Sequence, residues 1–171
     1  ICGMKGDNAY RVKDISISLL NEPLSAYYTK YQPMMSVENT SFNDLLDNKM
    51  RLVETIHIGI SYDLYFSVAS LLPFTDTQWA ELLGISAKSL TRYKTEDAHV
   101  FKSLQSEKIL EVAEVMLKGH EVLESSSSFD KWVMSPSVAL GGKSPYQLMS
   151  SSYGKGLVID ELNRIEYGIF A

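Results

Sequence analysis

The stretch Thr75–Arg92, TDTQWAELLGISAKSLTR, decides the fold because it carries the signals of two helices joined by a very short turn. The first helix starts at Thr75, whose side chain and that of Gln78 can each satisfy the other residue's backbone N–H in a capping box. The apolar residues after this start recur at helical spacing, and they are Trp79, Leu82 and Leu83. The sequence therefore predicts a short amphipathic helix that packs on a core.

Gly84 and Ser86 mark the turn that follows. Glycine readily takes a positive φ, and a serine hydroxyl caps the next helix, here over residues 87–96. A DNA-binding helix-turn-helix needs a small residue where the helices touch, a glycine in the turn and apolar anchors in the second helix. Residues of these kinds stand at the required spacing, namely Ala80, Gly84, Ile85 and Leu90. The same pattern also suits a helical hairpin inside a core, where small residues only permit close packing.

The outer face of the second helix carries side chains of the types that contact phosphates and base edges. These candidate DNA-binding residues are Lys88, Ser89, Thr91, Arg92 and Lys94. No acidic residue interrupts residues 86–95. A homodimer is expected, because one such unit buries too little surface for tight binding to operator DNA.

Length and composition limit the class of protein. A chain of 171 residues, with 45% hydrophobic and 22% charged residues, is typical of one compact unit or two small ones that share an interface. No apolar run is long enough to span a membrane and no signal peptide is evident, so we expect a cytoplasmic protein without membrane contact. The net charge of −5 argues against a protein that coats nucleic acid, but it leaves a local basic face possible.

The sequence gives little support for a catalytic or metal-binding role. Cys2 is the single cysteine, so no internal disulfide is possible. His57, His99 and His120 lack the paired spacing of metal ligands. Since no nucleophile, base and orienting group stand at an interpretable spacing, we expect no enzyme activity, no metal and no cofactor.

The remaining elements are read from periodicity and caps. Residues 54–61, ETIHIGIS, alternate like a short strand, and Ser61 then caps a helix that Pro73 stops. A long helical stripe runs over 103–116, and Gly119 is expected to interrupt it. Residues 125–128 are all serine and predict a solvated loop or a cap.

The last part of the chain predicts three short helices. Phe129, Trp132 and Val133 lie on one face of a helix that Pro136 ends. Ser144 starts the next helix, and a further helix over 158–165 is closed by Gly168. Since strand signals are few, the fold class is mainly α.

Residues 139–146, ALGGKSPY, look like the end of a phosphate-binding P-loop. A P-loop requires a glycine at position 137, which is Ser137, and a strand before it, where residues 132–136 read as a helix that ends in proline. Pro145 also removes a backbone N–H that a phosphate would use. We therefore expect a tight glycine turn that leads into a capped helix.

Taken together, the motifs resemble the Xre/MbcA/ParS family of antitoxins. The residues that carry the likeness, in chain order, are Gly59-Ile60-Ser61, Leu83-Gly84-Ile85-Ser86, Arg92, Trp132, Pro136, Leu140-Gly141-Gly142, Pro145, Gly154, Leu162-Asn163-Arg164-Ile165 and Gly168. The resemblance implies an Xre-like helix-turn-helix domain over 53–115 and a small, mostly helical toxin-binding domain over 116–171, after an N-terminal extension over 1–52.

The resemblance further implies an antitoxin that inhibits a RES-domain toxin, an enzyme that consumes NAD, and that represses its own operon as a dimer. For the toxin contact we expect exposed polar and aromatic side chains near the C-terminus, because such side chains are favoured at interface centres. They are Tyr153, Lys155, Arg164, Tyr167 and Phe170. A stand-alone helix-turn-helix regulator without a toxin partner, which uses its C-terminal part only to dimerise, remains the alternative.

Overall fold

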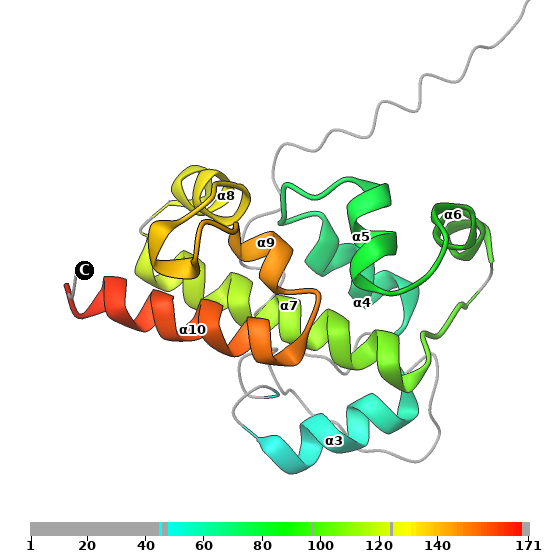
Figure 1. Ribbon diagram of the computed structural model, residues 1–171. Helices are drawn as coiled ribbons and strands as arrows, with labels where there is room; N and C mark the ends of the chain where they lie inside the picture. Colours follow the sequence, from blue (N-terminus) through cyan, green and yellow to red (C-terminus); the bar gives the residue numbers. More distant parts are fainter. Residues whose placement is uncertain (1–44, 46–47, 97, 124, 169–171) are drawn as a thin grey trace, which may run out of the picture.

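The computed structural model describes residues 45, 48–96, 98–123 and 125–168, and within these ranges the chain is helical and contains no strand (Figure 1). This confirms the prediction of a mainly α fold. The helices are α3 (Lys49–Ile58), α4 (Tyr62–Ala69), α5 (Asp76–Leu82), α6 (Ala87–Thr95), α7 (Ser103–Val122), α8 (Ser126–Met134), the 3₁₀ helix η2 (Val138–Leu140), α9 (Pro145–Leu148) and α10 (Ser152–Glu166).

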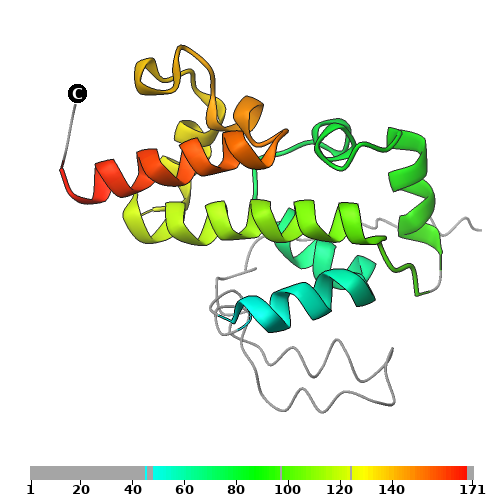
Figure 2. The ribbon, with the colours of Figure 1, turned by 60° about the horizontal axis from the view of Figure 1, so that its bottom comes forward.

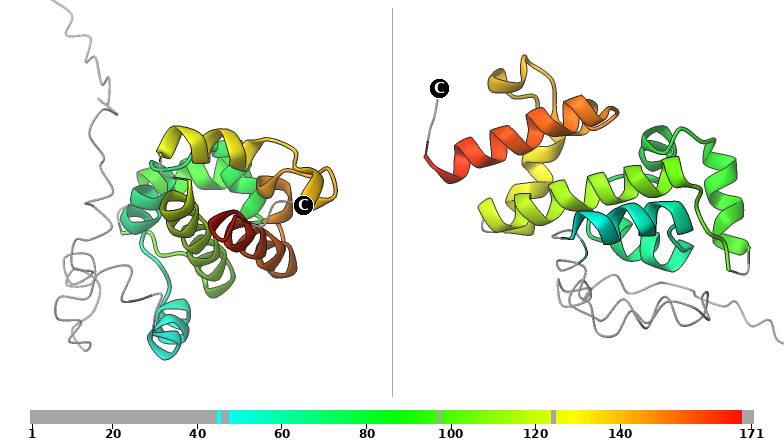
Figure 3. Two further views of the ribbon diagram at one scale, coloured as in Figure 1. Left: turned by 90° about the vertical axis from the view of Figure 1, so that its left-hand side faces the viewer. Right: turned by 90° about the horizontal axis from the view of Figure 1, so that it is seen from below.

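Helix α7 is the centre of the molecule. It packs against α3 and α4 on one side and against α8 and α10 on the other, and Figure 2 shows α7 and α10 side by side along most of their length. Figure 3 shows α3 beside the first turns of α7. The buried residues of α7 cover much of its circumference and are Ser106, Ile109, Leu110, Val112, Ala113, Val115, Met116 and Gly119.

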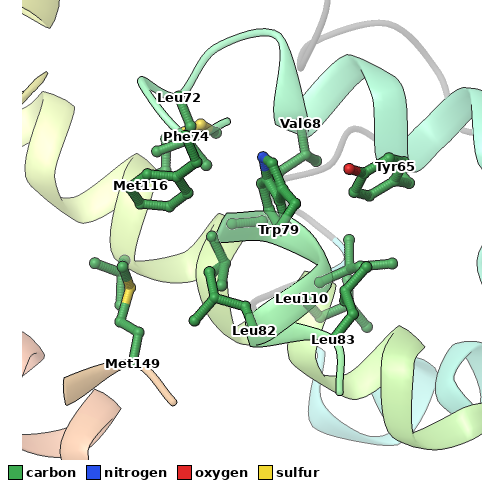
Figure 4. Packing of buried hydrophobic residues seen from close by; sticks show 14 of the residues in the cluster. Tyr65, Val68, Leu72, Phe74, Trp79, Leu82, Leu83, Leu110, Met116 and Met149 are labelled. Carbon is green, nitrogen blue, oxygen red and sulfur yellow. The ribbon is translucent and has the colours of Figure 1, made fainter. Parts of the chain in front are cut away.

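An aromatic cluster fixes α5 onto this centre. Trp79 is 1% exposed and makes edge contacts with Tyr65 at 5.2 Å and Phe74 at 5.7 Å between ring centroids. Leu82, Leu83 and Leu110 close the cluster below it (Figure 4). Edge-to-face ring contacts of this kind add to the stabilisation from apolar burial, so α5 is held firmly against the core.

Most local signals in the sequence are confirmed. Thr75 and Gln78 form the expected capping box, and a second box joins Ser144 to Gln147, with Pro145 in the first helical position. Ser61 and Ser86 cap α4 and α6. Each of these signals lies within four residues along the chain, and so it acts before any tertiary contact forms.

The glycine turn at residues 137–143 is also as expected. Gly141 and Gly142 both take positive φ, at 67° and 77°. The Ser137 carbonyl accepts hydrogen bonds from the Leu140 and Gly142 N–H groups, at 3.1 and 2.9 Å. The segment therefore folds back on itself as a compact turn that leads into α9.

The strand expected over residues 54–61 is wrong. Residues 49–58 form α3, capped by the Asn48 side chain, which accepts from the Arg51 N–H at 3.2 Å. The alternation of isoleucines was too short to outweigh helical packing, because Leu52, Thr55 and Ile56 face the core at helical spacing. Only Ile60 and Ser61 are extended, and Ser61 makes an isolated bridge to Val100.

Gly119 does not interrupt its helix, since α7 continues to Val122. A Cβ atom at Gly119 would overlap the ring of Phe129, which is fully buried on α8. The glycine therefore serves close packing between α7 and α8. A smaller difference is that Leu104, within the stripe expected over 103–116, is 77% exposed. The cap expected at residues 125–128 is confirmed, since Ser125 caps α8 and the serines after it form its first turn.

A matched pair of glycines on α10 gives a test of this packing. A Cβ at Gly154 would overlap the backbone carbonyl of Leu148, whereas one at Gly156 meets nothing within 4 Å. We expect Gly154→Ala to lower the free energy of unfolding by about 1–3 kcal/mol or more, and Gly156→Ala to raise it by about 0.5–1 kcal/mol. Urea unfolding of both variants measures this. Equal effects in the two variants would contradict the close approach of α9 to α10.

Candidate functional site

Helices α5 and α6 form a helix-turn-helix. α5 ends in a Schellman motif, in which the Ile85 N–H bonds the Ala80 carbonyl at 2.9 Å and the Gly84 N–H bonds the Glu81 carbonyl at 3.1 Å. Gly84 has φ 63°, as this motif requires. Ala80 and Leu90 are each 3% exposed, so the small residue and the apolar anchor of the second helix lie where the sequence placed them.

The outer face of α6 is polar and cationic. Among the candidate DNA-binding residues, Lys88, Thr91, Arg92 and Lys94 are exposed and Ser89 is half-buried. The hydroxyls of Ser89 and Thr91 are bound within the helix, to Ser86 Oγ at 2.9 Å and to the Ala87 carbonyl at 3.0 Å. Lys88 and Lys94 have no ion-pair partner among the described residues.

Arg92 is held in a network that the sequence analysis missed. Its Nε forms an ion pair with Glu96 Oε1 at 3.0 Å, and its Cζ lies over the Tyr93 ring, 5.3 Å from the ring centroid. The other Glu96 oxygen bonds His99 Nδ1 at 2.8 Å. Glu96 follows α6 directly as its C-cap residue. Its spacing of four from Arg92 was the available signal, because such pairs meet on a helix.

The C-terminal part presents a different surface. On α10 the core side carries Val158 and Leu162, which are fully buried. Residues on another side are strongly exposed, with Tyr153 at 92%, Leu157 at 55% and, just after the helix, Tyr167 at 75%. Positions 153, 157 and 167 fall on one face at helical spacing. We call these three residues the α10 stripe.

The candidate toxin-binding residues divide over this helix. Tyr153 and Tyr167 lie in the α10 stripe, which also contains Leu157, a residue that the sequence analysis missed. Lys155 instead points to α7 and pairs with Glu114 at 2.6 Å, while Arg164, half-buried, pairs with Glu161 at 3.2 Å. Phe170 lies outside the described residues. The spacing of four from Tyr153 was the signal that could have identified Leu157 on the same side of the helix.

Comparisons with known proteins agree with these two parts. Residues 51–114 match a model described as the antitoxin Xre-like helix-turn-helix domain. Residues 118–168 match one described as the antitoxin Xre/MbcA/ParS C-terminal toxin-binding domain. The chain belongs to the Xre/MbcA/ParS family of antitoxins. It is similar to an antitoxin Xre of Yersinia enterocolitica serotype O:8 / biotype 1B (strain NCTC 13174 / 8081), with 29% identity over 121 residues, which cover 70% of this chain and 81% of the relative.

Helix α7 crosses the boundary between the two matched regions of this antitoxin-family chain, since one ends at 114 and the other begins at 118. Three polar contacts join α7 to residues 149–166, and the partners come in the same order along both stretches of chain. Lys108 bonds the Met149 carbonyl at 3.1 Å, Glu114 pairs with Lys155, and Lys118 pairs with Glu166 at 2.8 Å. Helices α7 and α10 therefore run in the same direction.

Tyr146 joins the toxin-binding part directly to the helix-turn-helix. Its hydroxyl bonds Glu81 Oε2 at 2.9 Å and the Gln78 carbonyl at 3.4 Å, both on α5. Its ring contacts Phe74 at 5.1 Å between centroids. Burial, followed by the hydrogen bond to Glu81, raises the pKa of Tyr146 to about 12. The neutral phenol is therefore the form that this contact favours.

The pKa values of two further titratable groups, His120 and Asp130, are shifted by burial. Between α7 and α8, burial lowers the pKa of His120 and raises that of Asp130, and His120 Nδ1 and Asp130 Oδ1 are buried without a hydrogen-bond partner. Across the ranges described above, no three His, Cys, Asp or Glu side chains gather where a metal ion could bind. The helices of these ranges also include none that is long and apolar enough to cross a lipid bilayer.

The Tyr146 contact predicts a pH-dependent contribution to stability. We expect Tyr146→Phe to lower the free energy of unfolding by about 1 kcal/mol at neutral pH, through loss of the hydrogen bond to Glu81. Since the pKa is raised on folding, the contribution is complete below pH 10 and falls as pH rises towards 12. The difference between wild type and variant should therefore shrink over that window in urea unfolding. Tyr153→Phe, at an exposed tyrosine, is the control, and a difference that persists unchanged to high pH would contradict the contact.

Proposed function

We propose that this chain binds and inhibits a RES-type toxin that consumes NAD and, as a dimer, represses its own operon through DNA contacts of α6. The observation that carries the proposal is the pairing, in one chain, of a cationic exposed α6 with an exposed apolar and aromatic α10 stripe. These surfaces lie in the regions that match the helix-turn-helix and toxin-binding domains. The RES partner is supported by the resemblance of residues 132–168 to the family pattern.

Positive charge on α6 supports the proposed DNA contact. Lys88, Arg92 and Lys94 supply positive charge on an exposed helix, while the chain as a whole has a net charge of −5. Lys88 and Arg92, four residues apart, lie on one side of α6, and a local basic face of this kind on an acidic protein favours one docking orientation. Two copies would present two such helices, which matches recognition of paired half-sites.

Substitutions on α6 test the DNA contact, with a duplex that covers the promoter of the chain's own operon as the probe. We expect Lys94→Ala to reduce the slope of log affinity against log salt by about 1, and Arg92→Ala to weaken binding by about 1–3 kcal/mol and to relax sequence selectivity. Fluorescence anisotropy over a salt series measures both. Lys131→Ala, an exposed lysine on α8, is the matched control, and a response equal to that of Lys94→Ala would remove α6 as the docking helix.

Exposed aromatic and apolar side chains on α10 support the proposed toxin contact. Tyr153 and Tyr167 expose most of their surface, and Leu157 lies between them on the same face. Large aromatic side chains are favoured at the centres of protein interfaces, and charged side chains that are already paired contribute less there. The α10 stripe is therefore a better candidate for the toxin contact than Lys155, whose ammonium is engaged by Glu114.

Charge introduced into the α10 stripe tests this contact. We expect Leu157→Asp to weaken binding to the proposed RES-type toxin partner by about 2 kcal/mol or more, because a buried unpaired carboxylate is costly at an interface. Calorimetry gives the affinity, and cellular NAD during co-expression reports protection. Leu104→Asp, at an exposed leucine on α7, controls for stability and solubility.

Full protection of NAD by Leu157→Asp together with Tyr153→Ala would place the toxin contact elsewhere. If the wild-type chain leaves NAD unprotected but still binds its promoter, the stand-alone regulator becomes the better description, with the α10 stripe available for contact with a second copy.

A further inference from the structure

The acidic residue Glu96 lies at the end of the helix that is proposed to enter DNA, where a negative charge is unfavourable. A carboxylate near the phosphate backbone is repelled by it and reduces binding to DNA of any sequence. An isolated, exposed ion pair between residues four apart contributes little to stability, so stability gives Glu96 little reason to be there. Its contacts point to another role.

Both carboxylate oxygens of Glu96 are engaged. Oε1 forms an ion pair with Arg92 Nε at 3.0 Å, and Oε2 is hydrogen-bonded to His99 Nδ1 at 2.8 Å. The His99 side chain is only 15% exposed. Its ring stacks on Tyr93 with centroids 3.6 Å apart and planes 14° apart, and meets Phe101, a core residue, edge-on at 5.0 Å. The carboxylate is thus anchored to the folded core through a nearly buried ring.

The anchored carboxylate holds Arg92 by one edge. Its Nε forms the ion pair with Glu96 at 3.0 Å, and its Cζ lies over the Tyr93 ring, 5.3 Å from the ring centroid. The two Nη groups make no ion pair with a described residue. A guanidinium reads guanine with two parallel N–H groups in a fixed geometry. Fixing it in advance reduces the side-chain freedom that is lost on binding.

We propose that Glu96, anchored by His99, is a positioning residue that orients the Arg92 guanidinium for recognition of one base pair. The role rests on the proposed function, since it requires that α6 enters DNA. Glu96 sacrifices some general affinity for DNA through phosphate repulsion and gains selectivity at one position in the site. It acts through Arg92 and need not touch DNA itself.

Two substitutions at Glu96 separate positioning from charge. Glu96→Ala and Glu96→Gln remove the same negative charge, but the glutamine oxygen still accepts from Arg92 and its amide can donate to His99. Selection from a pool of duplexes with a randomised core gives the preferred sequence and the selectivity at each position. We expect Glu96→Ala to lower selectivity at a single base pair by roughly fivefold and Glu96→Gln to retain most of it. His99→Phe, which keeps the stack on Tyr93, should show an intermediate loss.

The mobility of the Arg92 Nε–H, followed by NMR in the free protein, provides a readout that does not depend on DNA. It should be restrained in wild type and Glu96→Gln and mobile in Glu96→Ala. Equal mobility in all three would overturn the proposal, as would a uniform gain in affinity for every sequence in both variants without loss of selectivity. A wild-type chain that selects no sequence would contradict DNA reading by α6 itself, and the positioning role would fall with it.

Discussion

The burial of α7 is the constraint on which the rest of the structure depends. Its side chains from Ile109 to Met116 are almost free of solvent, and helices from both matched regions pack against it. Regions of about this size are marginal on their own, because they bury only a small apolar core to offset the entropy lost when the chain is ordered. Sharing one central helix gives both a common core. The DNA-binding and toxin-binding regions are therefore functional divisions of a single folded unit.

The sequence predicted those parts of the fold that local interactions decide. The capping box at Thr75 and the glycine turn at Gly84 specify the helix-turn-helix within a few residues, and the same holds for the box at Ser144. Where the local structure depends on a residue far away in the sequence, the prediction was wrong. Gly119 looked like a helix end because nothing nearby in sequence shows the Phe129 ring that fills the space beside it. The isoleucines of α3 were misread because the surface that covers Leu52 and Ile56 belongs mainly to residues far along the chain.

The candidate sites divide in the same way. Exposed positions on α6 followed from helical periodicity once the turn was located, and Tyr153 followed from the amphipathic pattern of α10. The ion pair of Lys155 could not be predicted in this way, because its partner Glu114 lies on α7, 41 residues earlier in the sequence. In the network around Glu96, the pair with Arg92 could have been predicted from its spacing of four, but the contacts of His99 with Glu96 and Tyr93 depend on how the chain bends between α6 and α7. Ionic and aromatic contacts across a bend are decided by tertiary geometry, which a single sequence does not display.

Helix α7 is also a lever arm. Its 20 residues span about 30 Å at the usual rise per residue, and in Figure 1 α6 and the end of α10 lie towards opposite sides of the molecule. A rigid rod of about that length converts a tilt of about 10° at one end into a displacement of about 5 Å at the other. A small tilt of α7 at the end that follows α6 would thus move a partner seated on α10. Bending stiffness, more than the strength of any single bond, governs how faithfully the two ends keep their alignment.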